Sequence, residues 1–570
     1  MALPPLPETI DGLDATRWET FAPYYEALQA QALEPETVGP WLEQWSHLSR
    51  VVREAITWIN IEKSQDTTNA AREQAFLSVV NDVYPQAMRA EQALKERLLQ
   101  VEVHDPRMVV PLRNLRNEVD LFREANIPLI TRLQKLVNNY DRITGGLKTT
   151  WDEGEEMNLS QLDAMLVQPD RALRERAWRA MMALWLSQRE QLNQIYTDAL
   201  ALRTDVAQNA GLPDYRAYAF RDRGRFDYSP EDCFTFHEAI AEVVVPAARR
   251  VLLRRCRRLS LDSLRPWDLR VEPGAVEPLQ PYRETAELTA GVQSIFDQVD
   301  PALGSAFRTM VDEGLLDLET RPGKQLGGYC STLPLRRWPF IFMNGTGTHD
   351  DLQTMLHEAG HAFHAFAKLE MPLIWETATP MEFNEVASMA MELLAAPYLT
   401  RDKGGFYSQS EAARARIEHL EGILLFLPYM AVVDAFQHWV YTHVAEASEP
   451  ANLDMAWDEL WQKFMPVTDW SGFEDARETG WHRKLHIFTD PFYYVEYGIA
   501  QVGALQIWRN SLADPRGALA AYRQALAAGG TRTLPELFEL AGIDFRFDAV
   551  LLGELVALIE QTIADLETQR

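Results

Sequence analysis

Two histidines four residues apart, with a glutamate directly after the first, constrain this chain more than any other feature. His357 and His361 face the same way only if the segment between them is helical. Two imidazoles in that arrangement can share one zinc ion, and Glu358 is then placed to take a proton from an attacking water. The spacing therefore predicts a helix that carries two metal ligands and a general base.

The residues around this motif favour the same helix. Thr348 and Asp351 have the spacing of a capping box, and Asp350 also suits the positive end of a helix. His364 extends the histidine face by one turn, and we expect it to be structural or to support a ligand. Apolar residues recur at spacings typical of one buried helix face: Leu352, Met355, Leu356, Ala359, Phe363 and Phe366. The alternative is a buried helix whose histidines form hydrogen bonds within the protein core and bind no metal.

A catalytic zinc ion usually takes three protein ligands and one water. The metzincin pattern would require a glycine three residues and a histidine six residues after His361, but His364 and Ala367 occupy those places. That source of a third ligand is therefore excluded, and a glutamate from a following helix remains.

The segment after residue 379 provides that glutamate. Thr379, with proline and glutamate close behind it, predicts the start of a helix that should end before Pro397. Glu382, Glu385 and Glu392 fall roughly on one face of this helix. Glu385 lies one turn inside it among apolar neighbours, where a carboxylate needs a compensating charge. We therefore expect Glu385 to be the third ligand and Glu392 to hold an imidazole from outside.

A dense group of hydrogen-bond donors follows at 486–498. His486, Tyr493, Tyr494 and Tyr497 all lie in this stretch. An amide hydrolase must stabilise a tetrahedral oxyanion, and a phenol or imidazole often assists a metal in doing so. The alternative is a tyrosine-rich patch of the core.

Composition narrows the class of protein and its surroundings. A chain of 570 residues is too long for one hydrophobic core, and a net charge of −28 argues against nucleic acid or an anionic membrane as a partner. Cys233, Cys256 and Cys330 form no C-x-x-C pair, which favours a reducing compartment. We find no signal peptide and no uncharged apolar run long enough to span a bilayer, and we expect a cytoplasmic protein.

Amphipathic periodicity predicts a mainly helical chain. Apolar residues at three- and four-residue spacing indicate long helices at 18–32, 38–61, 67–102, 106–140, 171–209 and 230–258, and the C-terminal stretch 505–569 is also amphipathic. The arginines at 249–258 are better explained by the favourable end of a helix than by a nucleic-acid site. Residues 338–344 read as a strand that Pro339 would confine to a sheet edge or a strand start. Such an edge could bind an extended peptide, or the strand could simply belong to a supporting hairpin.

Several of these stretches, taken in order, resemble a known family, the thimet oligopeptidase and oligoendopeptidase F zinc metallopeptidases, and in particular its bacterial Pz-peptidase-like branch. The resemblance covers residues 200 to 510. It rests on the motif at 357–361 and on the stretches 221–238, 327–330, 339–344, 345–351, 383–388 and 486–498.

The resemblance implies a mainly α fold, in which two helical lobes flank a deep substrate channel and a small β-sheet lies beside the zinc helix. We expect an N-terminal helical lobe at 1–205 and a catalytic lobe at 206–570. In such a protein His357, His361 and Glu385 would hold one zinc ion, and Glu358 would be the general base. Tyr497, with Tyr494 or His486, would bind the oxyanion. The spacing from this histidine to the tyrosines differs by about one residue from that in the longer mammalian-type members, which leaves the choice of tyrosine open.

The hypothesis from the sequence is a cytoplasmic zinc endopeptidase that cleaves short, unstructured peptides and binds neither nucleic acid nor membranes. Two alternatives stay open. One is a dipeptidyl- or tripeptidyl-carboxypeptidase built on the same site, since the residue that captures a peptide terminus is not recognisable in a single sequence. The other is a non-catalytic helical scaffold that binds peptides. The oligomeric state is not indicated.

Overall fold

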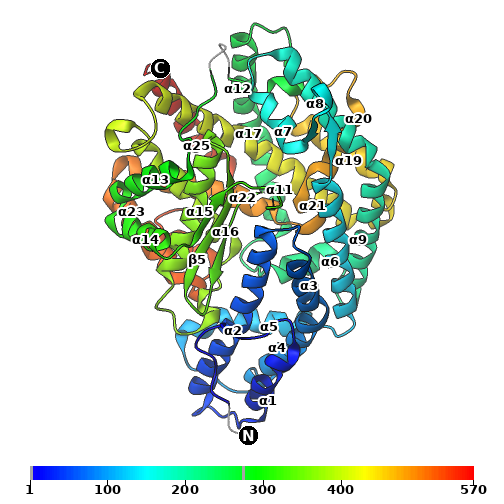
Figure 1. Ribbon diagram of the computed structural model, residues 1–570, viewed down its shortest axis with the longest axis vertical. Coiled ribbons are helices and arrows are strands. Elements are labelled where there is room, and N and C mark those ends of the chain that lie inside the picture. The colour runs from blue at the N-terminus through cyan, green and yellow to red at the C-terminus, as the bar shows by residue number, and fades with distance from the viewer. Residues whose placement is uncertain (1–3, 273–276, 326, 570) are drawn as a thin grey trace. The chain divides into compact units, whose positions relative to one another are not determined.

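The computed structural model describes residues 4–272, 277–325 and 327–569. Residues 1–3 lie outside the described residues. They belong to the N-terminal stretch in which the sequence analysis recognised no signal peptide. Helices dominate the described chain and two small sheets accompany them, which confirms the mainly α fold class (Figure 1).

The chain forms two compact units, each built from separate segments. The first unit comprises Met1–Glu124, Gln280–Ala412 and Ala500–Phe545, and the second comprises Ala125–Leu279, Ala413–Ile499 and Arg546–Arg570. The expected division at residue 205 does not fall on a boundary between these units. Helical periodicity marks where elements begin and end along the chain, whereas the units are defined by contacts between distant segments.

The N-terminal helices of the first unit pack around tryptophans. The ring centroids of Trp45 and Trp375 lie 4.4 Å apart, so this core joins the N-terminal segment to the segment that carries the histidine motif. The expected helix at 67–102 continues through a π-helical turn at Val79–Val83, whereas the one at 106–140 breaks where Phe122 becomes extended. The helices of this segment are α1 (Ala22–Ala30), α2 (Val38–Gln65), α3 (Ala70–Ser78), α4 (Tyr84–Leu98) and α5 (Val109–Leu121).

The other two segments of the first unit contribute more helices and the larger sheet. Figure 1 shows α15 and α16 beside β5. The helices are α13 (Thr285–Val299), α14 (Pro301–Asp312), α15 (His349–Ala367), α16 (Met381–Ala395), α23 (Pro515–Ala528) and α24 (Leu534–Leu540).

The sheet of the first unit has the order β3-β5-β4. The central strand β5 (Trp338–Gly345) pairs in parallel with β3 (Leu316–Glu319) and antiparallel with β4 (Tyr329–Leu333). Of the two places expected for Pro339, a sheet edge or a strand start, the structure has the second, because Pro339 is the second residue of a central strand. The two edge strands are β3 and β4, one on each side of β5.

The second unit is helical, with one two-stranded sheet formed by β1 (Lys148–Thr150) and β2 (Glu156–Asn158). The expected helix at 171–209 breaks at Gln188 into two helices, and the one at 230–258 continues through a π-helical turn. The helices are α6 (Asn126–Gly145), α7 (Leu159–Asp163), α8 (Arg171–Ser187), α9 (Arg189–Asn209), α10 (Tyr215–Asp222), α11 (Pro230–Ala239), α12 (Val245–Arg258), α18 (Val444–Ala447), α19 (Pro450–Phe464), α20 (Glu474–Glu478), α21 (Leu485–Thr489) and α25 (Ala549–Glu567).

Two further helices, α17 (Gln409–Thr442) and α22 (Tyr494–Ala513), contribute residues to both units. By length and composition α17 could cross a bilayer, but 67% of its most apolar stretch is buried within the protein. Burial of this kind is typical of a helix in a protein core.

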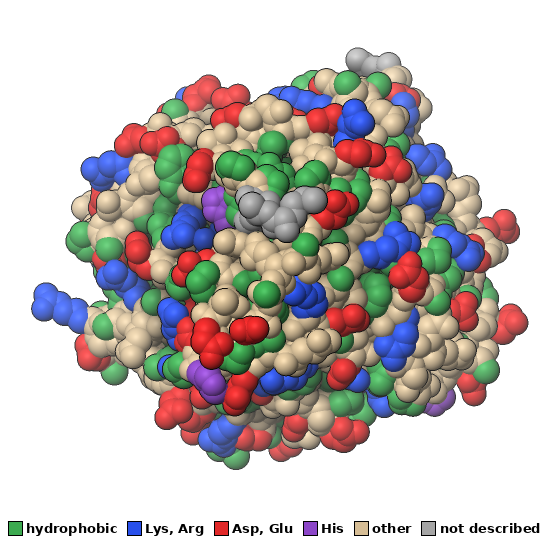
Figure 2. Space-filling model, turned by 90° about the horizontal axis from the view of Figure 1, so that it is seen from below, with side chains coloured by type: hydrophobic (Ala, Val, Ile, Leu, Met, Phe, Trp, Pro, Cys, Tyr) green, Lys and Arg blue, Asp and Glu red, His purple; other side chains and the backbone are tan. Residues whose placement is uncertain are grey.

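Arginines at the end of α12 pair with acids from other helices. Arg250 contacts Glu560 at 2.7 Å, and Arg254 contacts Glu421 at 2.5 Å. These contacts agree with a structural role for the basic run. On the molecular face in Figure 2, acidic and basic side chains are intermixed with apolar ones.

Candidate active site

The helix that carries the histidine motif begins in the predicted way. Thr348 is the N-cap of α15, and its hydroxyl and the Asp351 carboxylate form the expected capping box. Asp351 Oδ2 also accepts hydrogen bonds from Thr346 N at 2.7 Å and from the Tyr282 hydroxyl at 2.8 Å. These bonds fix the start of α15 directly after β5.

A glycine inside the motif lets α15 and α16 approach each other closely. A Cβ atom at Gly360 would lie 2.5 Å from Ser388 Cα and 2.7 Å from the Ala387 carbonyl oxygen, both in the backbone of α16. Real side chains avoid such distances, so only glycine fits here. The approach carries the side chains of one helix turn of α16 onto the histidine face of α15.

The two motif histidines and the predicted glutamate converge at this crossing. Glu385 Oε2 lies 3.4 Å from His357 Nε2 and 3.5 Å from His361 Nε2. Zinc–ligand bonds of about 2.0–2.1 Å at tetrahedral angles place neighbouring ligand atoms about 3.3 Å apart. The arrangement therefore fits a single tetrahedral metal ion with three protein ligands.

The expected outer contact to an imidazole is also present. Glu392 Oε1 lies 2.7 Å from His357 Nδ1, the ring nitrogen that faces away from Glu385. Ser388 Oγ donates to Glu385 Oε2 at 3.2 Å. A carboxylate behind a ligand imidazole fixes the ring orientation and the tautomer, and it makes the ligating nitrogen more basic.

The site carries excess negative charge that a cation would compensate. Burial works to lower the pKa of His357, but the carboxylates of Glu385 and Glu392 outweigh it and hold that pKa well above the usual value. Burial lowers the pKa of His361 to about 4, so this imidazole is neutral at pH 7 and its lone pair is available as a ligand. The chemistry of the donors thus suits a divalent metal.

Glu358 is held in the same site without being one of the three converging groups. Its side chain is buried, and burial, together with the carboxylates of Glu385 and Glu392, raises its pKa to about 7. A backbone hydrogen bond from Cys330 in strand β4 acts in the opposite direction. A carboxyl group with such a pKa can both accept and return a proton near neutral pH.

The start of α16 differs from the sequence expectation. Pro380 is the N-cap residue and provides no side-chain cap, so Thr379 does not cap the helix as predicted. The Thr379 hydroxyl instead lies 3.3 Å from His364 Nε2 and accepts a hydrogen bond from Lys368 Nζ at 3.2 Å. His364 is buried and has this structural contact, as expected for a histidine outside the ligand set.

The predicted oxyanion donors gather in the second unit. The ring centroid of His486 lies 5.3 Å from that of Tyr494 and 5.8 Å from that of Tyr497. The two tyrosines begin α22 and are spaced by one helical turn. Burial raises the pKa of Tyr494 well above its usual value, so its hydroxyl stays protonated and can donate a hydrogen bond.

A strained residue sets the direction in which α22 begins. Phe492 has φ = 66°, which is unfavourable for a bulky side chain. Its N–H donates to Gln437 Oε1 at 2.7 Å, and its carbonyl accepts from the Arg225 guanidinium. Arg225 also pairs with buried Glu496 at 2.8 Å. These contacts hold the turn that presents the first residues of α22.

Sequence reasoning missed two contributors to the site. Gly360 sets the distance between α15 and α16, and the Cys330 backbone in β4 donates to Glu358. The sequence signal for the first was a glycine inside a buried helix, which costs stability and therefore indicates close packing. The contact from the Cys330 backbone depends on which strand lies next to α15, and the periodicity of the sequence does not predict that.

The fold and this site together define a peptidase. The sequence profile of peptidase family M3 matches residues 164–556, which is more than half of the chain, and the chain belongs to that family.

Relatives and solved structures carry related names. The group B oligopeptidase PepB of Streptococcus agalactiae serotype III (strain NEM316) is 22% identical over 91% of this chain and 88% of its own length. The oligopeptidase PepF of Bacillus subtilis (strain 168) is 24% identical over 53% of this chain and 44% of its own length. The structure of PZ peptidase A with inhibitor 2 superposes with a TM-score of 0.89 at 26% identity and covers 99% of both chains. A putative oligoendopeptidase F has a TM-score of 0.87 at 25% identity and covers 98% of this chain and 97% of that chain.

Proposed function

We propose that this protein is a zinc-dependent endopeptidase that cleaves internal bonds of short, unstructured oligopeptides in the cytoplasm. The observation that carries the proposal is the convergence of His357, His361 and Glu385, with Glu358 beside them. Membership of peptidase family M3 supports peptide hydrolysis, and the names of the oligopeptidase and oligoendopeptidase relatives support short peptides as substrates.

His357, His361 and Glu385 would hold the zinc ion, and Glu392 would orient the His357 imidazole. When bound, zinc would supply Lewis acidity to the attacking water and to the scissile carbonyl. Glu358 takes the proton of the water at its carboxylate and passes that proton to the nitrogen of the leaving amine. The amide C–N bond breaks and one water is consumed, so the products are a carboxylate and a free amine.

The edge of the sheet offers a place for the peptide backbone. Within the described residues β4 pairs with β5 on one side, and Cys330 in β4 contacts Glu358. We propose that an extended peptide adds to the other side of β4 by backbone hydrogen bonds, which select for unstructured chains and are independent of side-chain sequence. This placement would bring the scissile carbonyl next to the general base.

The assignment of oxyanion donors stays a prediction. Tyr497, with Tyr494 or His486, would donate a hydrogen bond to the negative oxygen of the tetrahedral species. Tyr494→Phe, Tyr497→Phe and His486→Ala variants, measured separately, identify the donor. We expect the responsible variant to lose about 100- to 1,000-fold in kcat with little change in KM and unchanged metal content.

The central experiment uses a quenched-fluorescence peptide together with metal analysis. Wild-type protein should cleave the peptide, lose activity with a chelator and regain it with Zn²⁺. The Glu358→Gln variant should retain about one equivalent of Zn²⁺ at this site, and its kcat should fall by at least about 100-fold. Normal cleavage by a metal-loaded Glu358→Gln protein would refute the base assignment.

The same assay separates the alternatives. A peptide blocked at both ends should still be cleaved internally, as mass spectrometry of the products would show. Release of dipeptides or tripeptides from a free C-terminus, with no cleavage of the blocked peptide, would establish the carboxypeptidase alternative. Peptide binding without zinc and without hydrolysis would establish the scaffold.

The cytoplasmic location rests on a separate observation. Cys233, Cys256 and Cys330 are free cysteines, and free cysteines would suit a reducing compartment. Fractionation of cells that produce the full chain, followed by immunodetection, tests it. Recovery of the protein mainly outside the cytoplasm would overturn the proposed location and leave the chemistry untouched.

A further inference from the structure

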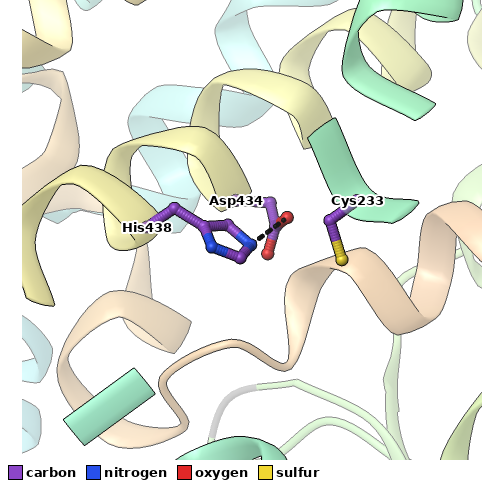
Figure 3. A group of neighbouring side chains, drawn as sticks. All are labelled: Cys233, Asp434 and His438. Atoms are coloured by element: carbon purple, nitrogen blue, oxygen red, sulfur yellow. Dashed lines mark ion pairs between the residues drawn. The ribbon is translucent and has the colours of Figure 1, made fainter. Parts of the chain in front are cut away.

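A second group of ligand-type side chains lies in the second unit, on two neighbouring helices. Cys233 and His237 are four residues apart on α11, and Asp434 and His438 are four residues apart on α17. Residues with this spacing share one helix face, so each helix presents a pair of donors. Figure 3 shows the Asp434 carboxylate between the His438 imidazole and the Cys233 thiol.

The group is almost completely removed from solvent. The exposed fractions are 2% for Cys233, 3% for His237, 0% for Asp434 and 2% for His438. Aromatic rings surround it: the centroid of Phe234 lies 4.8 Å from that of His438. A carboxylate in such surroundings is costly unless positive charge compensates it.

The contacts within the group use only part of its capacity. Asp434 Oδ2 lies 2.9 Å from His237 Nε2 and 3.3 Å from His438 Nε2. Within the described part of the chain, Asp434 Oδ1 and His438 Nδ1 are buried without a hydrogen-bond partner. A buried acceptor that is left unsatisfied loses its hydration without replacement and destabilises the folded state. The Oδ2 atom of Asp434 thus contacts histidine, whereas its Oδ1 atom has no hydrogen-bond partner among the described residues.

Ligand atoms of Cys233, Asp434 and His438 all lie within 4.8 Å of one another, and a single ion can contact all three. We propose that these residues form a second metal site that binds Zn²⁺ through thiolate, carboxylate and imidazole. His237 would hold the outer oxygen of the Asp434 carboxylate, as Glu392 holds His357 in the first unit. The ligands join α11 to α17, so the bound ion would stabilise the packing of those two helices.

The charge state of the group suits a cation. Binding of Zn²⁺ displaces the thiol proton of Cys233 to solvent, and the resulting set of one thiolate, one carboxylate and one imidazole neutralises the ion.

The sulfur ligand makes the site distinguishable from the candidate active site by spectroscopy. We would remove metal from the full-length protein and titrate it with Co²⁺, which takes the same ligands as zinc. A cobalt–thiolate bond absorbs in the near ultraviolet by charge transfer from sulfur, whereas a site of two histidines and a glutamate has no such band. We expect two equivalents of Co²⁺ per chain, with the thiolate band saturating at one equivalent.

Variants of the cysteines and of the motif histidines show which residues produce the thiolate band. Cys233→Ser should abolish it and lower the bound metal from two equivalents to one, with peptide cleavage retained. Cys330→Ser is the matched control, because the Cys330 thiol lies beside Glu358 in the candidate active site. The thiolate band should persist in this variant. A His357→Ala/His361→Ala variant should lose cleavage and keep the band. These readouts separate a failure of the second site from a failure of the proposed peptidase.

The proposal is overturned if wild-type protein binds one equivalent and shows no thiolate band. It is also overturned if the band disappears in Cys330→Ser and persists in Cys233→Ser. In either case Asp434 and its two histidines would form an ion-paired network without a metal.

Discussion

The closest backbone approach in the candidate active site gives a sharp prediction for Gly360→Ala. The added Cβ would lie 2.5 Å from Ser388 Cα, whereas ordinary contacts begin at 3.4 Å. The contacted atoms belong to the backbone of α16, so no side-chain rotation relieves the overlap. The helices must therefore separate by about 1 Å, the difference between these two distances.

That separation acts directly on the metal ligands. Glu385 lies on α16 within 3.5 Å of the imidazole nitrogens of α15. Zinc sites tolerate errors of only about 0.2 Å in ligand distance. We therefore expect Gly360→Ala to weaken Zn²⁺ binding at this site by at least about 10- to 100-fold and to lower kcat/KM in proportion at limiting zinc. The free energy of unfolding should change less than the free energy of zinc binding. Overpacking costs about 1–3 kcal/mol, but alanine recovers about 1 kcal/mol of this through its higher helix propensity.

Gly553→Ala is the matched control. Gly553 lies in α25, and a Cβ added there meets no atom within 4 Å. This variant should gain up to about 1 kcal/mol in unfolding free energy and keep its zinc affinity. Competition with a chromophoric chelator measures the affinity, and urea unfolding measures the stability. Wild-type zinc affinity and cleavage in Gly360→Ala would refute the argument that this glycine sets the ligand geometry.

Three further predictions concern the ligands and the sheet. Zinc removal by a chelator should lower the melting temperature, and added Zn²⁺ should restore it, as scanning calorimetry would show; an unchanged melting temperature would mean that the ion does not stabilise the fold. Glu392→Gln should weaken zinc binding about 10- to 100-fold while the ion still binds, and an unchanged affinity would contradict the role of this carboxylate behind His357. Burial works to raise the pKa of Asp317, but Arg321 and Lys324 lower it from 3.8 to about 2, so its stabilisation is present above pH 4 and is lost as the pH falls towards 2. Asp317→Asn should therefore cost at least about 1–2 kcal/mol at pH 7, and the difference from wild type in urea unfolding should narrow in acid; a constant difference between pH 7 and pH 2.5 would refute this assignment.

Most of the candidate metal site could be predicted from local sequence. The capping box at Thr348 and the ligand pair His357 and His361 depend on helical geometry alone, which fixes the direction of each side chain within one or two turns. Glu385 could be selected because an acidic residue among apolar neighbours on the following helix needs a charge partner. Each of these inferences spans a short stretch of chain in which one periodicity applies.

Other features depended on long-range packing. The strand at 338–344 could be recognised, but its place between β3 and β4 could not, since a strand's neighbours are chosen by segments elsewhere in the chain. The expected helix start at Thr379 failed for a similar reason. Its hydroxyl was free to cap α16, yet it contacts His364 and Lys368 because the packing of α15 brings those groups close.

The sequence by itself determined the helical class of this protein, the helix with His357 and His361, and the identity of the side chains available for metal chemistry. Only the tertiary structure decided how close α15 and α16 come at Gly360, which strand lies beside Glu358, and that Cys233 meets Asp434. Helical periodicity is a local property of the backbone, fixed by hydrogen bonds between residues four apart. The meeting of side chains two hundred residues apart is instead set by how buried surfaces fit together over a whole unit, and no local pattern records that fit.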